Sequence, residues 1–245
     1  MHPTSQELDL LAKAVDESGR HSTVQLTGAF AYAEGGATPL ATLLRLGEPA
    51  MKVYLTFVLA TREPPHEVYR SWQPARLARM LGFDDSDFDN AASAGTRRVQ
   101  RAFNALERAD PSFITRRKRP GRADLVTVNH FDEDLRPPYL TLPISLWQRG
   151  WINVMSVRAL AVYIALRRAC AGKEQELIHV TPYRLRNYGL SDDTLSRGAT
   201  ELQGLNLLKV TRGTPDDREA ARRQRRLFQL TSAAMNTEAP PQMRG

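Results

Sequence analysis

Two groups of side chains recur at spacings that would let them read a nucleic acid. In the first group, Arg97, Arg101, Asn104 and Arg108 follow one another at intervals of three or four residues, which places them on one face of a helix. Arginine and asparagine can form paired hydrogen bonds with guanine and adenine edges, each worth about 1–3 kcal/mol of discrimination between bases. The spacing therefore predicts a helix that recognises bases in a major groove.

The second group lies about 100 residues later and is more mixed in charge. Arg197 and Thr200 would project from the face of a helix opposite Leu195, Ala199 and Leu202. Hydroxyl groups near a helix start suit phosphate contacts instead of base readout. Two acidic residues at the same helix start oppose this interpretation, because they would repel phosphates.

Basic runs accompany both groups. From Thr96 to Arg122 there are nine basic and two acidic residues, so this stretch alone carries a net charge of +7, equal to that of the whole chain. A second run extends from Arg222 to Arg226. Such runs suit salt-dependent contacts with phosphates or a minor groove. The predicted DNA-contacting residues are Arg97, Arg98, Arg101, Asn104, Arg116, Arg117, Lys118, Arg119, Arg122, Tyr183, Arg184, Ser191, Thr194, Ser196, Arg197, Thr200, Arg222, Arg223, Arg225 and Arg226.

Catalytic and metal-binding patterns are absent from the sequence. The five histidines are scattered without metal-ligand spacing, and Gly172-Lys173 lacks the glycine-rich loop of a phosphate site. The single cysteine, Cys170, follows an apolar run and is interpreted as a packing residue. We therefore expect no enzymatic activity, no metal and no cofactor.

Composition indicates a folded protein with a polyanionic partner. The 245 residues are 42% apolar and 25% charged, which is typical of globular chains, and the sequence pI is about 9.8. The longest apolar stretches fall far short of the roughly 20 residues that a membrane span needs. One cysteine allows no internal disulfide. We expect a cytoplasmic, nucleoid-associated protein with no membrane partner.

The elements that would position these groups occur twice in the same order. Around residues 50–58 and 157–164, apolar residues recur at helical spacing. After each comes a short helix with proline near its start, stopped by Gly82 or Gly189, then a longer helix and two strands. The Pro120-Gly121 turn would join the first two strands, and Ser191 would cap the second long helix.

This repeat predicts a mainly α fold with small β-wings, arranged as two tandem winged helix-turn-helix domains. The expected boundaries are a partly ordered N-terminal arm over 1–45, a first domain over 46–129, a linker over 130–143, a second domain over 144–232 and a flexible tail over 233–245. Matching the two copies places about 11 extra residues in the first, within the acidic segment Asp84–Gly95.

Several motifs resemble those of bacterial winged-helix DNA-binding proteins. They are the run from Tyr139 to Trp151, Ala159–Tyr163, Tyr188–Thr194, and the leucine- and glycine-containing segment Glu201–Leu208. The tandem arrangement over residues 49–231 is also similar to that of plasmid replication initiators. The resemblance implies that one domain binds repeated sites while the other dimerises, so a homodimer is left open.

The favoured interpretation is sequence-specific binding of double-stranded DNA by a bacterial transcriptional regulator. One alternative is a plasmid or mobile-element replication initiator that binds repeated origin sites. The other is an adaptor whose winged helices bind protein, with the basic wings incidental.

Overall fold

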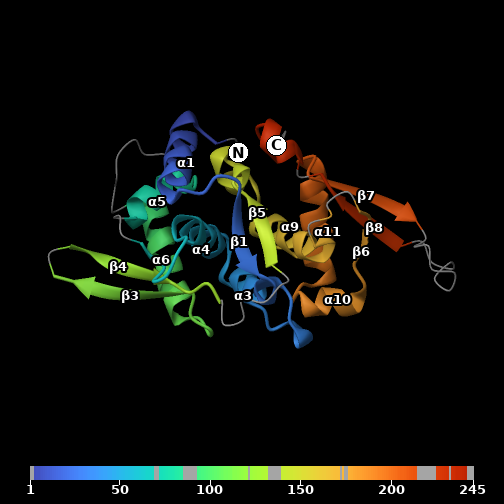
Figure 1. The fold of residues 1–245 in the computed structure, drawn as a ribbon, viewed down its shortest axis with the longest axis horizontal. Helices are drawn as coiled ribbons and strands as arrows, with labels where there is room; N and C mark the ends of the chain where they lie inside the picture. Colours follow the sequence, from blue (N-terminus) through green and yellow to red (C-terminus); the bar gives the residue numbers. More distant parts are fainter. Residues whose placement is uncertain are drawn as a thin grey trace.

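Two apolar helices, α4 (Glu48–Ala60) and α9 (Val157–Cys170), lie in the centre of the molecule (Figure 1). Every residue of α4 from Ala50 to Leu59 is buried, and so is every residue of α9 from Ala159 to Leu166. A helix that is apolar on all sides must be covered on all sides. The remaining elements therefore pack around these two helices and against one another.

The computed structural model describes residues 3–68, 72–84, 93–120, 122–131, 139–171, 173, 176–213, 225–231 and 233–241. Within these ranges the fold is mainly helical with small antiparallel sheets. The coarse fold class expected from the sequence is thus confirmed.

The same order of elements follows each central helix. After α4 come β2 (Glu67–Val68), α5 (Pro74–Met80), α6 (Ala94–Arg108), β3 (Ile114–Arg119) and β4 (Arg122–Val128). After α9 come β6 (Ile178–His179), α10 (Pro182–Asn187), α11 (Asp192–Gly204), β7 (Leu208–Gly213) and β8 (Arg225–Leu230). The two sheets have matching strand orders, β2-β4-β3 and β6-β8-β7. The order of elements along the chain and the strand order in the sheets therefore show that one structural unit occurs twice.

Equivalent glycines end the short helix of each unit. Gly82 and Gly189 have φ angles of +69° and +66°, a region that glycine enters without steric cost. In both turns the residue after the glycine donates its backbone N–H to the carbonyl of the fifth residue before it, as in a Schellman motif. The long helices α6 and α11 then begin in the same way, because Ser93 and Ser191 accept hydrogen bonds from the backbone N–H three residues ahead.

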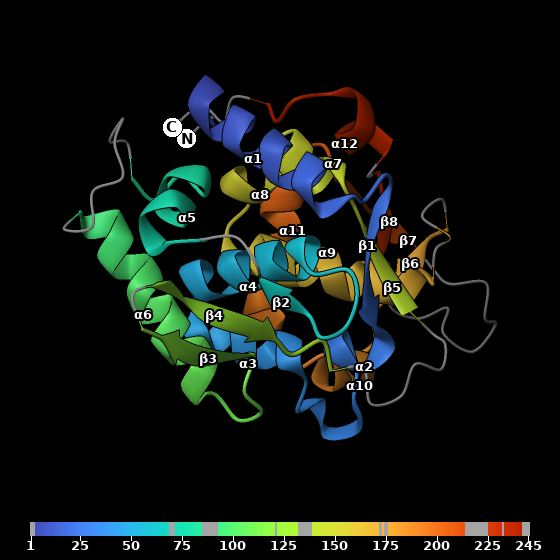
Figure 2. The same cartoon turned by 60° about the vertical axis from the view of Figure 1, so that its left-hand side comes forward.

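The N-terminal segment is not an arm, and that expectation was wrong. Residues 5–46 form α1 (Ser5–Ser18), β1 (Thr23–Thr27), α2 (Gly28–Ala31), the 3-10 turn η1 (Glu34–Gly36) and α3 (Pro39–Leu46). Leu11, Phe30 and Leu40 are fully buried. Helix α1 packs on α4, α5 and α7 (Figure 2), while the N–H of Ala33 donates to the carbonyl of Asn187 on α10 at 3.0 Å. The segment therefore bridges both units.

The expected linker and tail also contain packed elements. Strand β5 (Tyr139–Pro143) pairs antiparallel with β1 and buries Leu140 and Leu142; residues 132–138 lie outside the described part of the chain. The short helices α7 (Ser145–Gln148) and α8 (Trp151–Val154) follow. Beyond the second unit, α12 (Ala233–Thr237) buries Met235. One hydrophobic core runs through all these elements, so the predicted division into separate domains does not describe the packing.

A buried ammonium group joins helix α4 to helix α8. Lys52 on α4 is 1% exposed, lies 2.7 Å from a carboxylate oxygen of Glu48, and donates to the carbonyl of Asn153 on α8 at 2.9 Å. The side-chain amide of Asn153 in turn donates to Glu7 at 2.8 Å and to the carbonyl of Met80 at 3.0 Å. Burial lowers the pKa of Lys52, while Glu48 opposes that shift. The ammonium group thus depends on partners from several elements.

Replacing Glu48 by glutamine leaves Lys52 buried without its nearest counter-ion. We expect Glu48→Gln to lower the free energy of unfolding by about 1–3 kcal/mol, measured by urea denaturation. The matched control is Glu176→Gln, which breaks an exposed pair with Lys173 and should cost less than about 0.5 kcal/mol. Equal losses of unfolding free energy in the two variants would show that the buried Lys52–Glu48 pair stabilises the fold no more than an exposed pair does.

Candidate nucleic-acid interface

The two hairpins project from opposite ends of the molecule, each beside the long helix of its own unit (Figure 1). Hairpin β3–β4 contacts α6 through β3, and hairpin β7–β8 contacts α11 through β7. The residues expected to bind DNA therefore form two separate surfaces. We call them the α6 surface, made by α6 with β3–β4, and the α11 surface, made by α10 and α11 with β7–β8.

Helix α6 has the amphipathic character that its sequence predicts. Val99, Phe103 and Leu106 are buried on one side. Arg97 and Arg101 are exposed on the other, as is Arg108. Within the described part of the chain, no ion-pair partner is present for these three guanidinium groups. Their donors therefore face solvent, where an anionic partner could reach them.

One side of this helix borders a shallow hollow. Arg98 and Arg101, with Ala102 and Ala105, line a cavity of about 260 Å³ against Leu46, Pro49 and Ala50 at the α3–α4 corner. The guanidinium of Arg98 lies over the ring of Phe83, 5.2 Å from its centre, a distance typical of a cation–π contact. Arg98 is thus exposed to solvent and packs against Phe83 at the same time.

Arg116 and Asn104 hydrogen-bond to each other, which the sequence analysis did not anticipate. Arg116 donates to Glu107 through its backbone N–H at 3.1 Å and through Nε at 3.0 Å. Its Nη2 donates to Oδ1 of Asn104 at 2.7 Å. The hydrogen bonds that Glu107 accepts from Arg116, chiefly those from its side chain, lower the pKa of Glu107. Arg116 thus braces the hairpin against α6, and Asn104 accepts one of its hydrogen bonds. Contact of either residue with DNA stays a prediction.

The rest of the first hairpin is variably exposed. Arg117 and Lys118 on β3 are exposed. Arg119 is half-buried and interacts with another group of the protein. Arg122 begins β4, where its backbone pairs with Arg119. Its side chain is not among those that the structure describes. Arg117 and Lys118 are therefore the described cations of this hairpin that solvent reaches most freely.

The α11 surface is largely satisfied by its own contacts. Arg197 donates through Nε to Asp193 at 2.8 Å, and both side chains are exposed. Ser196 accepts a hydrogen bond from Arg226 of β8 at 3.1 Å. Thr200 lies on the exposed side, and its hydroxyl donates to the carbonyl of Ser196. A DNA contact by Arg197 would have to replace the pairing with Asp193.

Two hydroxyl groups predicted to meet phosphate serve the helix start. Ser191 caps α11, as expected, and its hydroxyl lies 2.9 Å from that of Thr194. Thr194 is only 9% exposed, which leaves its predicted phosphate contact little accessible surface. Tyr183 and Arg184 on α10 are exposed. Arg222 and Arg223 lie outside the described residues, and Arg225 is described only through its backbone in β8.

Sequence reasoning missed two residues that shape these surfaces. Arg186 is exposed on α10, three residues after Tyr183, and helical spacing alone could have placed it there. Glu107 was counted only as a negative charge within a basic stretch. Its position next to Arg108 on α6 gave no signal that it would reach the hairpin.

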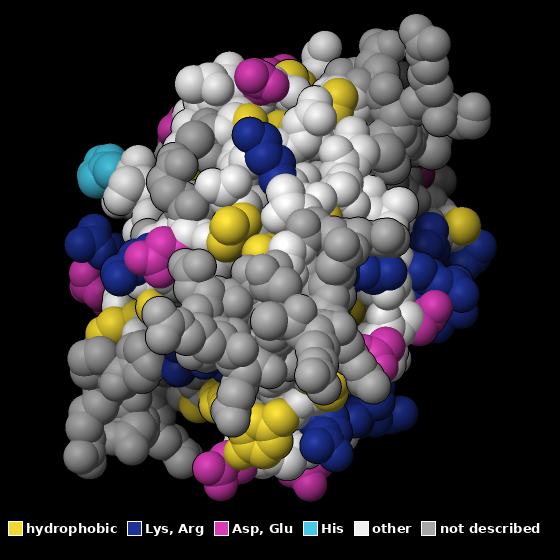
Figure 3. All heavy atoms as spheres, turned by 90° about the vertical axis from the view of Figure 1, so that its right-hand side faces the viewer, with side chains coloured by type: hydrophobic (Ala, Val, Ile, Leu, Met, Phe, Trp, Pro, Cys, Tyr) yellow, Lys and Arg dark blue, Asp and Glu magenta, His cyan; other side chains and the backbone are white. Residues whose placement is uncertain are grey.

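On the end of the molecule that carries the second unit, described basic side chains lie in separate groups with acidic ones among them (Figure 3). Among the described helices, none combines the length and apolar character needed to cross a bilayer. Nor do three or more histidine, cysteine, aspartate or glutamate side chains gather as a metal site within the residues described. Comparisons with protein-family models, curated proteins and solved structures give no match to this chain.

The Glu107–Arg116 contact should stabilise the protein in a pH-dependent way. Since the folded-state pKa of Glu107 lies below its ordinary value of 4.5, its contribution is present above pH 4.5 and is lost as the pH falls through the folded-state value. We expect Glu107→Gln to lower the free energy of unfolding by about 1–2 kcal/mol at pH 7. The difference from wild type, followed by urea denaturation, should shrink on acidification below pH 4.5.

The matched control is Glu63→Gln, which removes a looser, exposed contact with Arg62 at 3.8 Å. That variant should stay within about 0.5 kcal/mol of wild type at every pH. A Glu107→Gln deficit that persists unchanged in acid would contradict the assignment to an ionised Glu107.

Proposed function

We propose that each repeated unit is a winged helix-turn-helix and that the protein binds double-stranded DNA sequence-specifically, with α6 and α11 as recognition helices. The observation that carries this proposal is the recurrence, in both units, of a short helix, a glycine turn, a serine-capped long helix and an adjoining basic hairpin. A helix-turn-helix directs one face of its second helix outward, where it can enter a major groove.

The α6 surface is proposed to supply most of the affinity. Arg97, Arg101 and Arg108 are exposed on the outer face of α6, and Arg117 and Lys118 extend the positive surface onto the hairpin. Cations that are not already paired can release counter-ions from DNA when they bind phosphates. Bracing by Arg116 and Glu107 would hold this hairpin at a fixed angle to the recognition helix.

The α11 surface is proposed to contribute selectivity. Arg197 would exchange its exposed pairing with Asp193 for a base edge, and an exposed ion pair is worth at most about 1 kcal/mol. The exchange is therefore favourable only where the contact with a base contributes at least as much free energy as the lost ion pair. Asp193 would at the same time disfavour phosphates placed close to it, which penalises an incorrect docking position.

The symmetry of the DNA sites that the protein selects would distinguish a transcriptional regulator from a replication initiator. Because one core holds both units, a single chain would engage two sites at a fixed spacing. A transcriptional regulator acting as a homodimer should select inverted repeats, whereas a replication initiator should select direct repeats. We favour regulation of transcription. Replication initiation is the second candidate, because a chain that carries two units in tandem could bind directly repeated sites.

The test is selection of bound duplexes from a random pool at about physiological salt, followed by binding across a salt series. Arg197→Ala should relax preference at one base position by about 1–3 kcal/mol and leave random-sequence binding nearly unchanged. Arg117→Ala should weaken binding to all duplexes alike and reduce the salt slope by about one.

Lys13→Ala is the control, because Lys13 is an exposed cation on α1, outside both proposed surfaces. Equal losses for Arg197→Ala on selected and random duplexes would remove the base-readout assignment. If no motif is enriched and Arg117→Ala binds like wild type, DNA binding fails as a function, and the protein-adaptor alternative replaces it.

A further inference from the structure

A basic cavity lies away from both recognition helices. It has a volume of about 330 Å³ and sits between the end of α4, strand β1 and the base of the β2–β4–β3 sheet. This volume falls at the lower end of the range for small-molecule sites. The lining residues are Arg20, Gln25, Leu26, Thr27, Arg62, Pro64, His66, His130 and Tyr139.

Arg20 is held in place by the end of helix α4. Its Nε donates to the carbonyl of Leu59 at 2.9 Å, and its Nη2 donates to the carbonyls of Val58 and Thr61, both at 3.1 Å. These hydrogen bonds satisfy carbonyls that a helix C-terminus leaves without partners. The Nη1 group has no hydrogen-bond partner among the described residues. Arg20 therefore brings a fixed positive charge and an available donor to the cavity.

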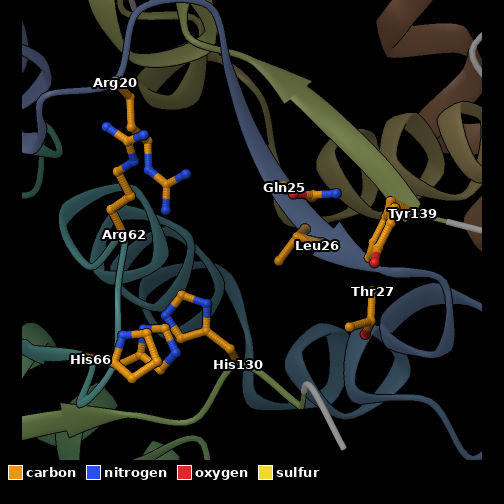
Figure 4. A pocket seen from close by; sticks show the side chains of 9 residues that line it. Arg20, Gln25, Leu26, Thr27, Arg62, His66, His130 and Tyr139 are labelled. Atoms are coloured by element: carbon orange, nitrogen blue, oxygen red, sulfur yellow. The ribbon is translucent and has the colours of Figure 1, made fainter. Parts of the chain in front are cut away.

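A second guanidinium lies beside the first. Figure 4 shows Arg62 next to Arg20 on one side of the cavity, with Gln25, Thr27 and Tyr139 across from them. Arg62 makes only a loose contact with Glu63, at 3.8 Å, and both side chains are largely exposed. No acidic side chain belongs to the described lining. Two like charges that lie side by side favour an anion between or beside them.

Two histidine rings complete this side of the cavity. The rings of His66 and His130 stack with their centres 3.9 Å apart, as Figure 4 shows. Nε2 of His130 lies 2.8 Å from the hydroxyl of Thr61. Burial, with smaller contributions from His66 and Arg20, lowers the pKa of His130 to about 3. The ring is therefore neutral at pH 7, and the positive surroundings already disfavour a further proton there.

We propose that this cavity is a binding site for a small organic anion whose carboxylate or phosphate group is held by Arg20 and Arg62. The neutral polar groups of Gln25, Thr27 and Tyr139 would meet the remainder of the ligand, alongside Leu26 and the histidine rings. Arginine suits this task because its planar fork matches carboxylate and phosphate oxygens with two hydrogen bonds.

The bound anion would connect segments that are far apart in the sequence. Arg20 lies in the loop between α1 and β1, and Arg62 follows α4. Thr27 ends β1, and His66 directly precedes β2. The carbonyl of His66 accepts from the N–H of Val128 at the end of β4 at 2.9 Å. A ligand in the cavity therefore stabilises the base of the first hairpin. This inference is independent of the proposed DNA binding.

The experiment is isothermal titration calorimetry of the full chain with inorganic phosphate and with citrate, at constant ionic strength maintained with sodium chloride. We expect saturable binding of one anion per chain, accompanied by a rise in Tm that follows the ligand concentration. Arg62→Gln should weaken binding by about tenfold or more. Arg158→Gln, which removes an exposed arginine on α9 outside the cavity lining, should bind as wild type does.

Arg62 is exposed, so its replacement should leave the fold intact, and the Tm without anion checks this. The site is overturned if neither probe binds saturably, or if Arg62→Gln and Arg158→Gln bind the anion equally well. A random-sequence duplex provides a further arm. If it displaces phosphate and loses affinity in Arg62→Gln to the same degree, the cavity holds DNA backbone phosphate and the small-anion proposal is replaced.

Discussion

The buried ammonium group of Lys52 brings together elements that are far apart in the sequence. A charge cannot remain 1% exposed unless polar partners surround it. Glu48 supplies the counter-charge and Asn153 the carbonyl, while the amide of Asn153 reaches Glu7 and Met80. The N-terminal helix α1, the end of the short helix α5 and helix α8 must therefore meet at one point.

Within that shared framework the two units diverge in charge rather than in topology. Their sheets have the same strand order, and their helix turns use equivalent glycines. Yet the outer face of α6 presents exposed arginines, whereas Arg197 of α11 is paired with Asp193. Backbone geometry is conserved between the units because caps and turns depend on a few local residues. Surface charge differs between the two units, and this difference is the basis for the different tasks proposed for α6 and α11.

The sequence predicted the repeated elements well because each has a strong local signal. Helix α4 has a long apolar run, and Gly82 and Ser191 mark a helix end and a helix start. The N-terminal segment and β5 were missed because the burial of their apolar residues, such as Leu40 or Leu142, depends on distant partners. The role of Arg116 was missed for the same reason: its partner Glu107 lies nine residues away on another element. Local signals place elements; long-range contacts decide what side chains do.

Arginine illustrates this limit most clearly. Arg20 closes the end of α4, Arg116 braces a hairpin and Arg101 faces solvent, although all three look alike in the sequence. What separates them is the nearest acceptor: helix-end carbonyls, a carboxylate or water. A guanidinium satisfied within the protein gains little from a new anion, while one with donors to spare gains more. The net charge of +7 therefore does not measure the capacity to bind anions. We propose that this capacity resides in the guanidinium groups that keep available donors, on α6 and at the cavity beside α4.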